Sequence, residues 1–231
     1  APTSENEYDG TSKESATVSY SEGWQGGELA IVYENNKNAG TATAKIQKEG
    51  AIASVNFVIK AAEPNEEIPS SLVATYGDTL ADVTLPSGWT WKDSSLSVGD
   101  VGSKTFKAVF TPSDSNYKTL EVDIPVLVEQ ATPSYSTPTG ITAVYGTSLN
   151  QINLPNGWSW RAPTAKVGNV GEQQHSAYYT SADSNYKQVE VLLTVTVTKA
   201  PLTVKAKDHT ITYGDAPANA GAEYEGFVLG D

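Results

Sequence analysis

Cysteine and methionine are absent from the 231 residues, and histidine occurs only twice, as His175 and His209. Without cysteine the chain has no disulfide framework, no thiolate zinc site, no iron–sulfur cluster and no cysteine nucleophile. Any imidazole chemistry would depend on the two histidines. No run of about 18 apolar residues occurs, so we expect no membrane insertion. Residues 1–4 lack the basic and apolar regions of a signal peptide.

Basic charge is also scarce, because 15 Lys and Arg residues face 27 Asp and Glu residues and the net charge is −12. A strongly acidic chain repels phosphate backbones, so we expect no nucleic-acid partner. The motifs Gly-x-Ser-x-Gly and His-Glu-x-x-His and a phosphate-binding glycine loop are missing as well. We therefore expect a non-enzymatic protein.

The main feature of the chain is a repeat. Two similar segments occur, and corresponding residues in them are always 69 positions apart. The copies share a Tyr-Gly turn, a Leu-Pro-x-Gly-Trp-x-Trp segment, a Val-Gly-x-Val-Gly segment and an Asp-Ser-Asn-Tyr-Lys segment. These segments begin at Tyr76 and Tyr145, Leu85 and Leu154, Val98 and Val167, and Asp114 and Asp183. Since no insertion or deletion separates the copies, the main prediction is a tandem array.

A shorter module that resembles the repeat precedes the two copies, and a partial module follows them. The predicted domains are residues 1–63, 64–132, 133–199 and 200–231. The last range is about half as long as a repeat, so we expect the chain to be part of a longer multidomain polypeptide.

The modules are predicted to be mostly β. Residues 105–110 alternate apolar and polar side chains, and residues 189–197 form a β-branched run. One helical turn is predicted at residues 79–83, capped by Asp78, and Pro125 predicts an edge strand or a bulge. The fold class is all-β, with small β-sandwich or β-grasp-like modules and at most a short helical turn each. Because the linkers are short, we expect an elongated rod.

The repeated motifs resemble bacterial Ig-like repeats of Gram-positive cell-surface proteins. Residues 8–11 and 36–40 are similar to the YDG-type variant, so residues 1–63 resemble a YDG-type module. Residues 202–231 are similar to the start of an MBG-type domain, truncated here. The resemblance implies an extracellular, cell-surface or cell-wall-associated protein. It implies a stalk, a spacer or an adhesin, and a host surface protein as a partner of the adhesin.

The candidate ligand-binding residues are the five tryptophans. They are Trp24, Trp89, Trp91, Trp158 and Trp160. Residues two apart on a strand share a face at about 7 Å, so each repeated pair could stack on sugar rings. This gives an alternative function, the binding of starch or another polysaccharide. The competing interpretation is that the repeated pairs pack in the core or between modules. Trp24 lies in a glycine-rich loop without a counterpart, which makes it the better ligand candidate.

Oxygen-rich segments raise the question of calcium. Residues 114–116 and 183–185 offer carboxylate and amide oxygens, but they lack the glycine and bidentate glutamate of an EF-hand loop. Asx turns before a packed tyrosine explain them better. We therefore predict no cofactor and no metal site, and leave a surface calcium ion open. His175 takes the place of Phe106 and is predicted to be a packed histidine.

Overall fold

The computed structural model describes residues 6–216 and 220–227, and its regular structure is almost entirely β-strand. The helical content is two single turns of 3-10 helix. The predicted all-β fold with at most a short helical turn per module is therefore confirmed. Within the described part no helix has the length and apolar character needed to cross a bilayer. Two sequence predictions fall partly outside the described residues. Residues 1–4 bear on the signal peptide, and residues 228–231 end the segment that resembles an MBG-type domain.

The chain divides into two compact units, Ala1–Glu129 and Gln130–Asp231. Among the described residues, four sheets are formed, and each unit carries two of them. We call the segments that carry these sheets modules 1 to 4, in chain order. Each sheet is drawn from a single one of the four predicted ranges. Whether those ranges are independent domains, and whether they form a rod, stay predictions.

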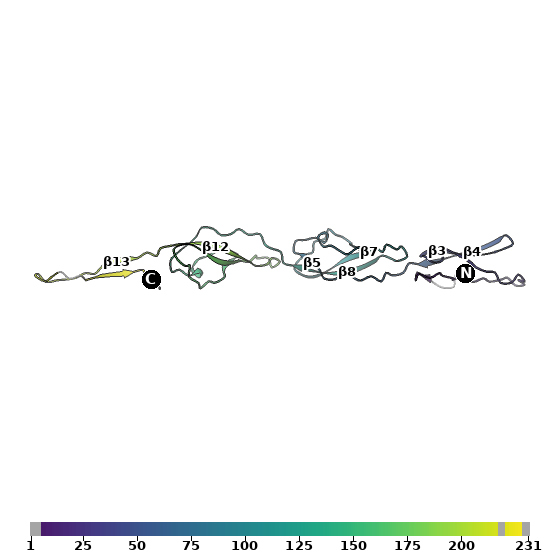
Figure 1. Cartoon of the computed structure of the whole chain (residues 1–231), viewed down its shortest axis with the longest axis horizontal. Coiled ribbons are helices and arrows are strands. Elements are labelled where there is room, and N and C mark those ends of the chain that lie inside the picture. Colours follow the sequence, from purple (N-terminus) through teal and green to yellow (C-terminus); the bar gives the residue numbers. More distant parts are fainter. Residues whose placement is uncertain (1–5, 217–219, 228–231) are drawn as a thin grey trace. The chain divides into compact units, whose positions relative to one another are not determined.

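Module 1 contains one four-stranded sheet in the order β1-β4-β3-β2. Its strands are β1 (Asn6–Glu7), β2 (Val32–Glu34), β3 (Gly40–Lys48) and β4 (Ala51–Lys60). The first strand runs parallel to the last, whereas β3 is antiparallel to both of its neighbours. Figure 1 shows β3 and β4 as a hairpin.

Modules 2 and 3 repeat this strand order. In module 2 the sheet order is β5-β8-β7-β6, and in module 3 it is β9-β12-β11-β10 with β10 at the far edge. The elements of module 2 are β5 (Leu72–Thr75), η1 (Leu80–Asp82), β6 (Trp89–Trp91), β7 (Gly102–Phe110) and β8 (Leu120–Glu129). Those of module 3 are β9 (Ile141–Val144), η2 (Leu149–Gln151), β10 (Trp158–Trp160), β11 (Gly171–Tyr179) and β12 (Val189–Thr198). The labels β5, β7 and β8 can be followed in Figure 1.

The sequence left a sandwich and a β-grasp-like sheet open as topologies. In the described residues, each of modules 1 to 3 has a single sheet whose first strand pairs in parallel with its last. Module 4 is described as a two-stranded antiparallel sheet of β13 (Thr203–Ala206) and β14 (Ala222–Glu225).

The core of module 2 lies between one face of its sheet and the 3-10 turn. Strand β8 alternates, with Val126 and Val128 at most 1% exposed and the exposed Leu127 between them. Leu80 of η1 is also 1% exposed and packs in the same cluster with Val83 and Val98. The turn and the following loop thus shield this face of the sheet from water. Burial of apolar surface in this way is the main favourable contribution to folding.

The 3-10 turn begins one residue later than the predicted helical turn, and its cap differs from the prediction. The N-cap is Thr79 and not Asp78. The Asp82 carboxylate accepts hydrogen bonds from the backbone N–H and the hydroxyl of Thr79, each at 2.9 Å. Asp78 instead accepts the backbone N–H of Thr75 at 2.7 Å, because it closes the Tyr-Gly-Asp turn that leads out of β5.

The prediction of an edge strand or a bulge at Pro125 is wrong. Strand β8 lies between β5 and β7, and its pairing with β7 is continuous, with Thr105 opposite Pro125. The pairing with β5 starts only at Leu72 and Val126. Pro125 therefore has a paired strand on one side only, which is why its missing N–H is tolerated.

Candidate functional sites

Two of the five candidate tryptophans are buried. Trp89 is 6% exposed and packs with Ala108 and Ile124, and its ring centroid lies 5.3 Å from that of Phe110. Trp160 is 8% exposed and belongs to the core of module 3. An indole in such a position offers no open face to a sugar.

The other two repeated tryptophans, Trp91 and Trp158, are half-buried. The indole N–H of Trp91 donates to the carbonyl of Val83 at 2.9 Å, which fastens β6 to the end of the 3-10 turn. The Trp158 ring lies 5.6 Å from Tyr135 and 5.3 Å from Tyr179. For all four repeated tryptophans these contacts favour the packing interpretation over ligand binding.

Trp24 is 38% exposed and organises its own loop. Tyr20 stacks on its ring at 5.4 Å, and the Lys48 ammonium lies 4.6 Å from the ring centroid. The indole N–H donates to the carbonyl of Gly27 at 2.7 Å. The loop borders an open cleft of about 870 Å³ that reaches Ile52 at the end of the β3–β4 hairpin. Trp24 is thus the one candidate tryptophan that combines exposure with a cleft.

The predicted packed histidine fits its surroundings. His175 Nε2 lies 3.1 Å from the carbonyl oxygen of Val167, and its ring meets Trp160 edge-on at 6.1 Å. His209 is exposed. Among the described residues, no three His, Asp or Glu side chains are grouped as a metal site would require.

A site that the sequence did not predict lies at the link between modules 1 and 2. We call residues 114–118 the junction loop. Asp114 Oδ1 accepts the backbone N–H of Asn116 at 2.9 Å, so the loop begins with the predicted Asx turn. The linker residue Ala62 then donates its N–H to the carbonyl of Asn116 at 3.0 Å and accepts the N–H of Lys118 at 2.8 Å. The linker and the junction loop are therefore joined by a short parallel β-bridge between Ala62 and Tyr117.

Two side chains of the junction loop reach module 1 itself. Asn116 Oδ1 accepts the backbone N–H of Ala39, just before β3, at 2.7 Å. The ring of Tyr117 meets Tyr8, just after β1, edge-on at 5.5 Å. Two strand termini of module 1 are thereby in contact with module 2. They are the end of β1, through Tyr8, and the start of β3, through Ala39.

Charge adds to the same junction. Lys118 forms an ion pair with Glu63 at 2.7 Å, and this hydrogen bond raises the pKa of Lys118. The pKa of Tyr8 is also raised, first by desolvation and then by the negative charge of Asp114. Both shifts are upward, so Lys118 keeps its charge and Tyr8 stays neutral to a higher pH than the free side chains would.

The second unit contains the same arrangement, within itself, at the 69-residue shift. Ala131 donates its N–H to the carbonyl of Asn185 at 3.0 Å and accepts the N–H of Lys187 at 2.9 Å. Asp183 Oδ1 accepts the N–H of Asn185 at 2.9 Å. The clamp of loop on linker is therefore part of the repeat. The signal for it in the sequence is that Ala62 and Ala131 obey the same shift as the two loops.

Comparison with known proteins does not assign the chain to a family. No family model matches the chain, and no curated protein matches it. Among solved structures, the three-domain fragment I67–I69 of titin (an E-to-A variant) is 11% identical, with 76% of this chain and 84% of that chain covered and a TM-score of 0.29. Extracellular domains 3–5 of Drosophila OTK are 12% identical, covering 69% and 71%, with a TM-score of 0.26. Immunoglobulin domains 1–4 of Sidekick-1 are 9% identical, covering 74% and 61%, with a TM-score of 0.19. At these scores the likenesses support no detailed inference, so the all-β assignment depends on the strands themselves.

Proposed function

We propose that the chain is a spacer segment of an exported surface protein, in which tandem β modules hold an adhesive part away from the cell. The observation that carries the proposal is the junction loop. A binding module needs no specific clamp on its linker, whereas a spacer loses reach when its modules swing freely. Here the linker backbone, the module 1 backbone and a tyrosine pair are all engaged by one loop.

Export and a cell-surface location are supported by the resemblance of the repeated motifs to Gram-positive surface repeats. The absence of cysteine is compatible with such a location. In the same proposal, the anchor and the adhesive part lie in other parts of a longer polypeptide.

The spacer function can be tested by display on a cell. The chain is placed between a surface anchor and a terminal antibody epitope, and a second version lacks residues 64–132, one full repeat. We expect the epitope to become less accessible to a large antibody when the repeat is removed. In the matched control, a Gly/Ser linker of about 15 residues replaces the repeat; at about 5–6 Å × √n it spans about 20 Å, less than the roughly 33 Å of the ten-residue strand β8 alone, so it should not restore accessibility. Equal accessibility in all three versions would contradict the spacer function.

A second candidate function, polysaccharide binding, is favoured by one observation only, the exposed Trp24 beside its open cleft. Aromatic rings stack on the apolar faces of sugars, and the Trp24 ring lines this cleft. Electrophoresis in gels that contain starch, xylan or mannan tests it. Retardation that is lost in Trp24→Ala and retained in Trp89→Tyr would support binding at this loop. Unchanged mobility in every gel would leave the spacer or a protein-binding adhesin.

A further inference from the structure

Strand β4 of module 1 has one edge that is paired only at its end. Strand β1 meets this edge at Ile59 and Lys60, and no other strand or isolated bridge of the described residues joins it. In modules 2 and 3 the corresponding parallel strand, β5 or β9, pairs over four residues. The stretch from Ala51 to Val58 is therefore an open strand edge.

Every second residue of this stretch directs its backbone groups to the open edge. The carbonyl of Lys60 accepts the N–H of Tyr8, just after β1, at 2.9 Å, so Lys60 faces the β1 side of the strand. Because the direction of the backbone groups alternates along a strand, Ile52, Ser54 and Asn56 face the same side. Strand β3 lies on the opposite side. A row of N–H and carbonyl groups without a paired strand is a template for another strand.

The strand pairing shows which residues occupy these places in the other modules. Gly40 begins β3 opposite Ile59, and Gly102 begins β7 opposite Val128. Counted back from Ile59 and Val128, residues 52, 54 and 56 of β4 correspond to residues 121, 123 and 125 of β8. The same count in β12, from Val197, gives residues 190, 192 and 194.

Module 2 is protected against strand addition at this edge. The three places in β8 hold Glu121, Asp123 and Pro125. Charged side chains and proline on an edge are devices by which native sheets avoid edge-to-edge pairing, and proline has no N–H to donate to an added strand. If two copies of β8 lay antiparallel around Asp123, its carboxylate would also stand opposite a like charge, which is destabilising.

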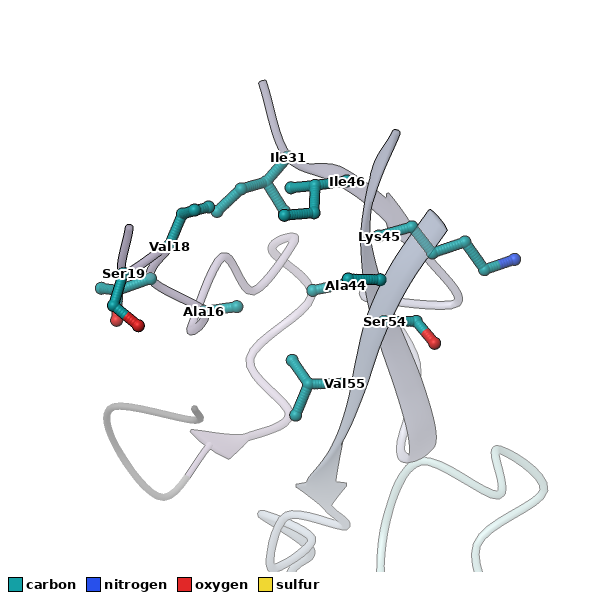
Figure 2. Close-up of a pocket in the computed structure, with 11 residues that line it drawn as sticks. Ala16, Val18, Ser19, Ile31, Ala44, Lys45, Ile46, Ser54 and Val55 are labelled. Atoms are coloured by element: carbon teal, nitrogen blue, oxygen red, sulfur yellow. The ribbon is translucent and has the colours of Figure 1, made fainter. Parts of the chain in front are cut away.

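Module 1 has none of these protections. No charged residue and no proline occurs from Ala51 to Ile59. Ile52 and Val58 are 65% and 59% exposed, and Figure 2 shows Ser54 turned away from the pocket that Val55 lines. Segments of six or seven residues with high β-propensity, low charge and no proline pair readily with identical segments.

The edge of β4 is matched by a second β4. When two copies lie antiparallel around Ser54, the residues that face the open edge meet each other, with Ser54 opposite Ser54 of the second copy and Ile52 opposite Asn56. No charge is then brought opposite a like charge. The pair has two-fold symmetry, which is the commonest symmetry of soluble homo-oligomers.

We propose that the open edge of β4 is a self-association site, at which a second copy of this chain adds its own β4 antiparallel to the first. The two β3–β4 hairpins then belong to one continuous sheet, held by interchain backbone hydrogen bonds between residues 52 and 56. The site uses neither the junction loop nor Trp24, so the proposal does not depend on the spacer function or on polysaccharide binding.

Sedimentation velocity of the full chain over a range of concentrations is the first test, and we expect a reversible monomer–dimer equilibrium. Asn56→Pro introduces the residue that β8 holds at this place and removes one interchain donor from each copy, so association should weaken at least about tenfold. Ser54→Asp places two carboxylates opposite each other and should weaken it as well, which keeps the test valid if Asn56→Pro fails to fold. Leu192→Asp, at the place of Ser54 in module 3, is the matched control and should leave association unchanged.

Hydrogen exchange at single amides is the second test, because it identifies the edge that pairs. The amides of Ser54 and Asn56 should become more protected as the dimer forms, whereas the amide of Val55, which faces β3, should not change. The proposal is overturned if the chain stays monomeric at every concentration, or if both variants dimerise like the original chain. It is also overturned if Leu192→Asp abolishes the dimer, or if Ser54 and Asn56 are equally protected in the monomer, since another segment of the chain would then cover the edge.

Discussion

The junction between modules 1 and 2 can be weakened by one substitution, Asn116→Ala. It removes the acceptor of the Ala39 N–H and leaves this half-buried donor without a partner. A typical hydrogen bond contributes about 0.5–1.5 kcal/mol net, and an unsatisfied donor costs about 1–3 kcal/mol. Since Ala39 is half-buried and water can replace part of the loss, we expect about 1–2 kcal/mol.

Hydrogen exchange at single amides is the suitable assay, because 1–2 kcal/mol corresponds to about a 5–30-fold change in an equilibrium. In Asn116→Ala the Ala39 amide should lose its protection. If the junction stabilises module 1, the central amides of β3 and β4 should also exchange about 5–30 times faster. Asn65→Ala, at an exposed linker position, is the matched control and should change neither. Faster exchange at Ala39 alone, with β3 and β4 unaffected, would refute the coupling of the two modules.

Three further perturbations test the packing and the charges. Trp160→Ala should destabilise module 3 by about 3–5 kcal/mol in denaturant unfolding, whereas Leu192→Ala, at 59% exposure on the same sheet, should change it by less than about 0.5 kcal/mol; similar losses would contradict the core position of Trp160. Gly88→Ala should destabilise module 2 more than Gly99→Ala, because both glycines have positive φ but a Cβ at Gly88 would lie 2.6 Å from Phe110; equal unfolding midpoints would count against this geometry. The Asp9 side chain accepts hydrogen bonds from Lys13 first and Thr11 next, which lower its pKa below the ordinary 3.8, so its contribution to stability is present above that value and is lost as the pH falls below it. Asp9→Asn should therefore make the unfolding midpoint less dependent on pH in acid, and an unchanged dependence would show that Asp9 does not contribute.

The sequence predicted the elements that depend on local patterns. The constant shift between Tyr76 and Tyr145 gave the repeat, alternation around Phe106 gave a strand, and Asp114 before Asn116 gave an Asx turn. Each of these follows from side chains only a few residues apart, or from the comparison of two copies.

What the sequence could not predict depends on distant partners. The bond from Ala39 to Asn116 joins residues 77 positions apart, and no local pattern marks Asn116 as a junction residue. The burial of Trp89 against Ala108 and Ile124, and of Trp160 in the core of module 3, depends on strands that follow later in the chain, and alternation alone does not identify the buried face.

The proposed spacer function requires that the junction loop hold modules 1 and 2 in one fixed orientation. Residual dipolar couplings of the full chain, fitted separately to the two modules, test it most directly. We expect one common alignment tensor for both modules, and two different tensors in Asn116→Ala combined with Tyr117→Ala. Different tensors in the unaltered chain would show that the modules move independently, and would contradict the spacer function that depends on their coupling.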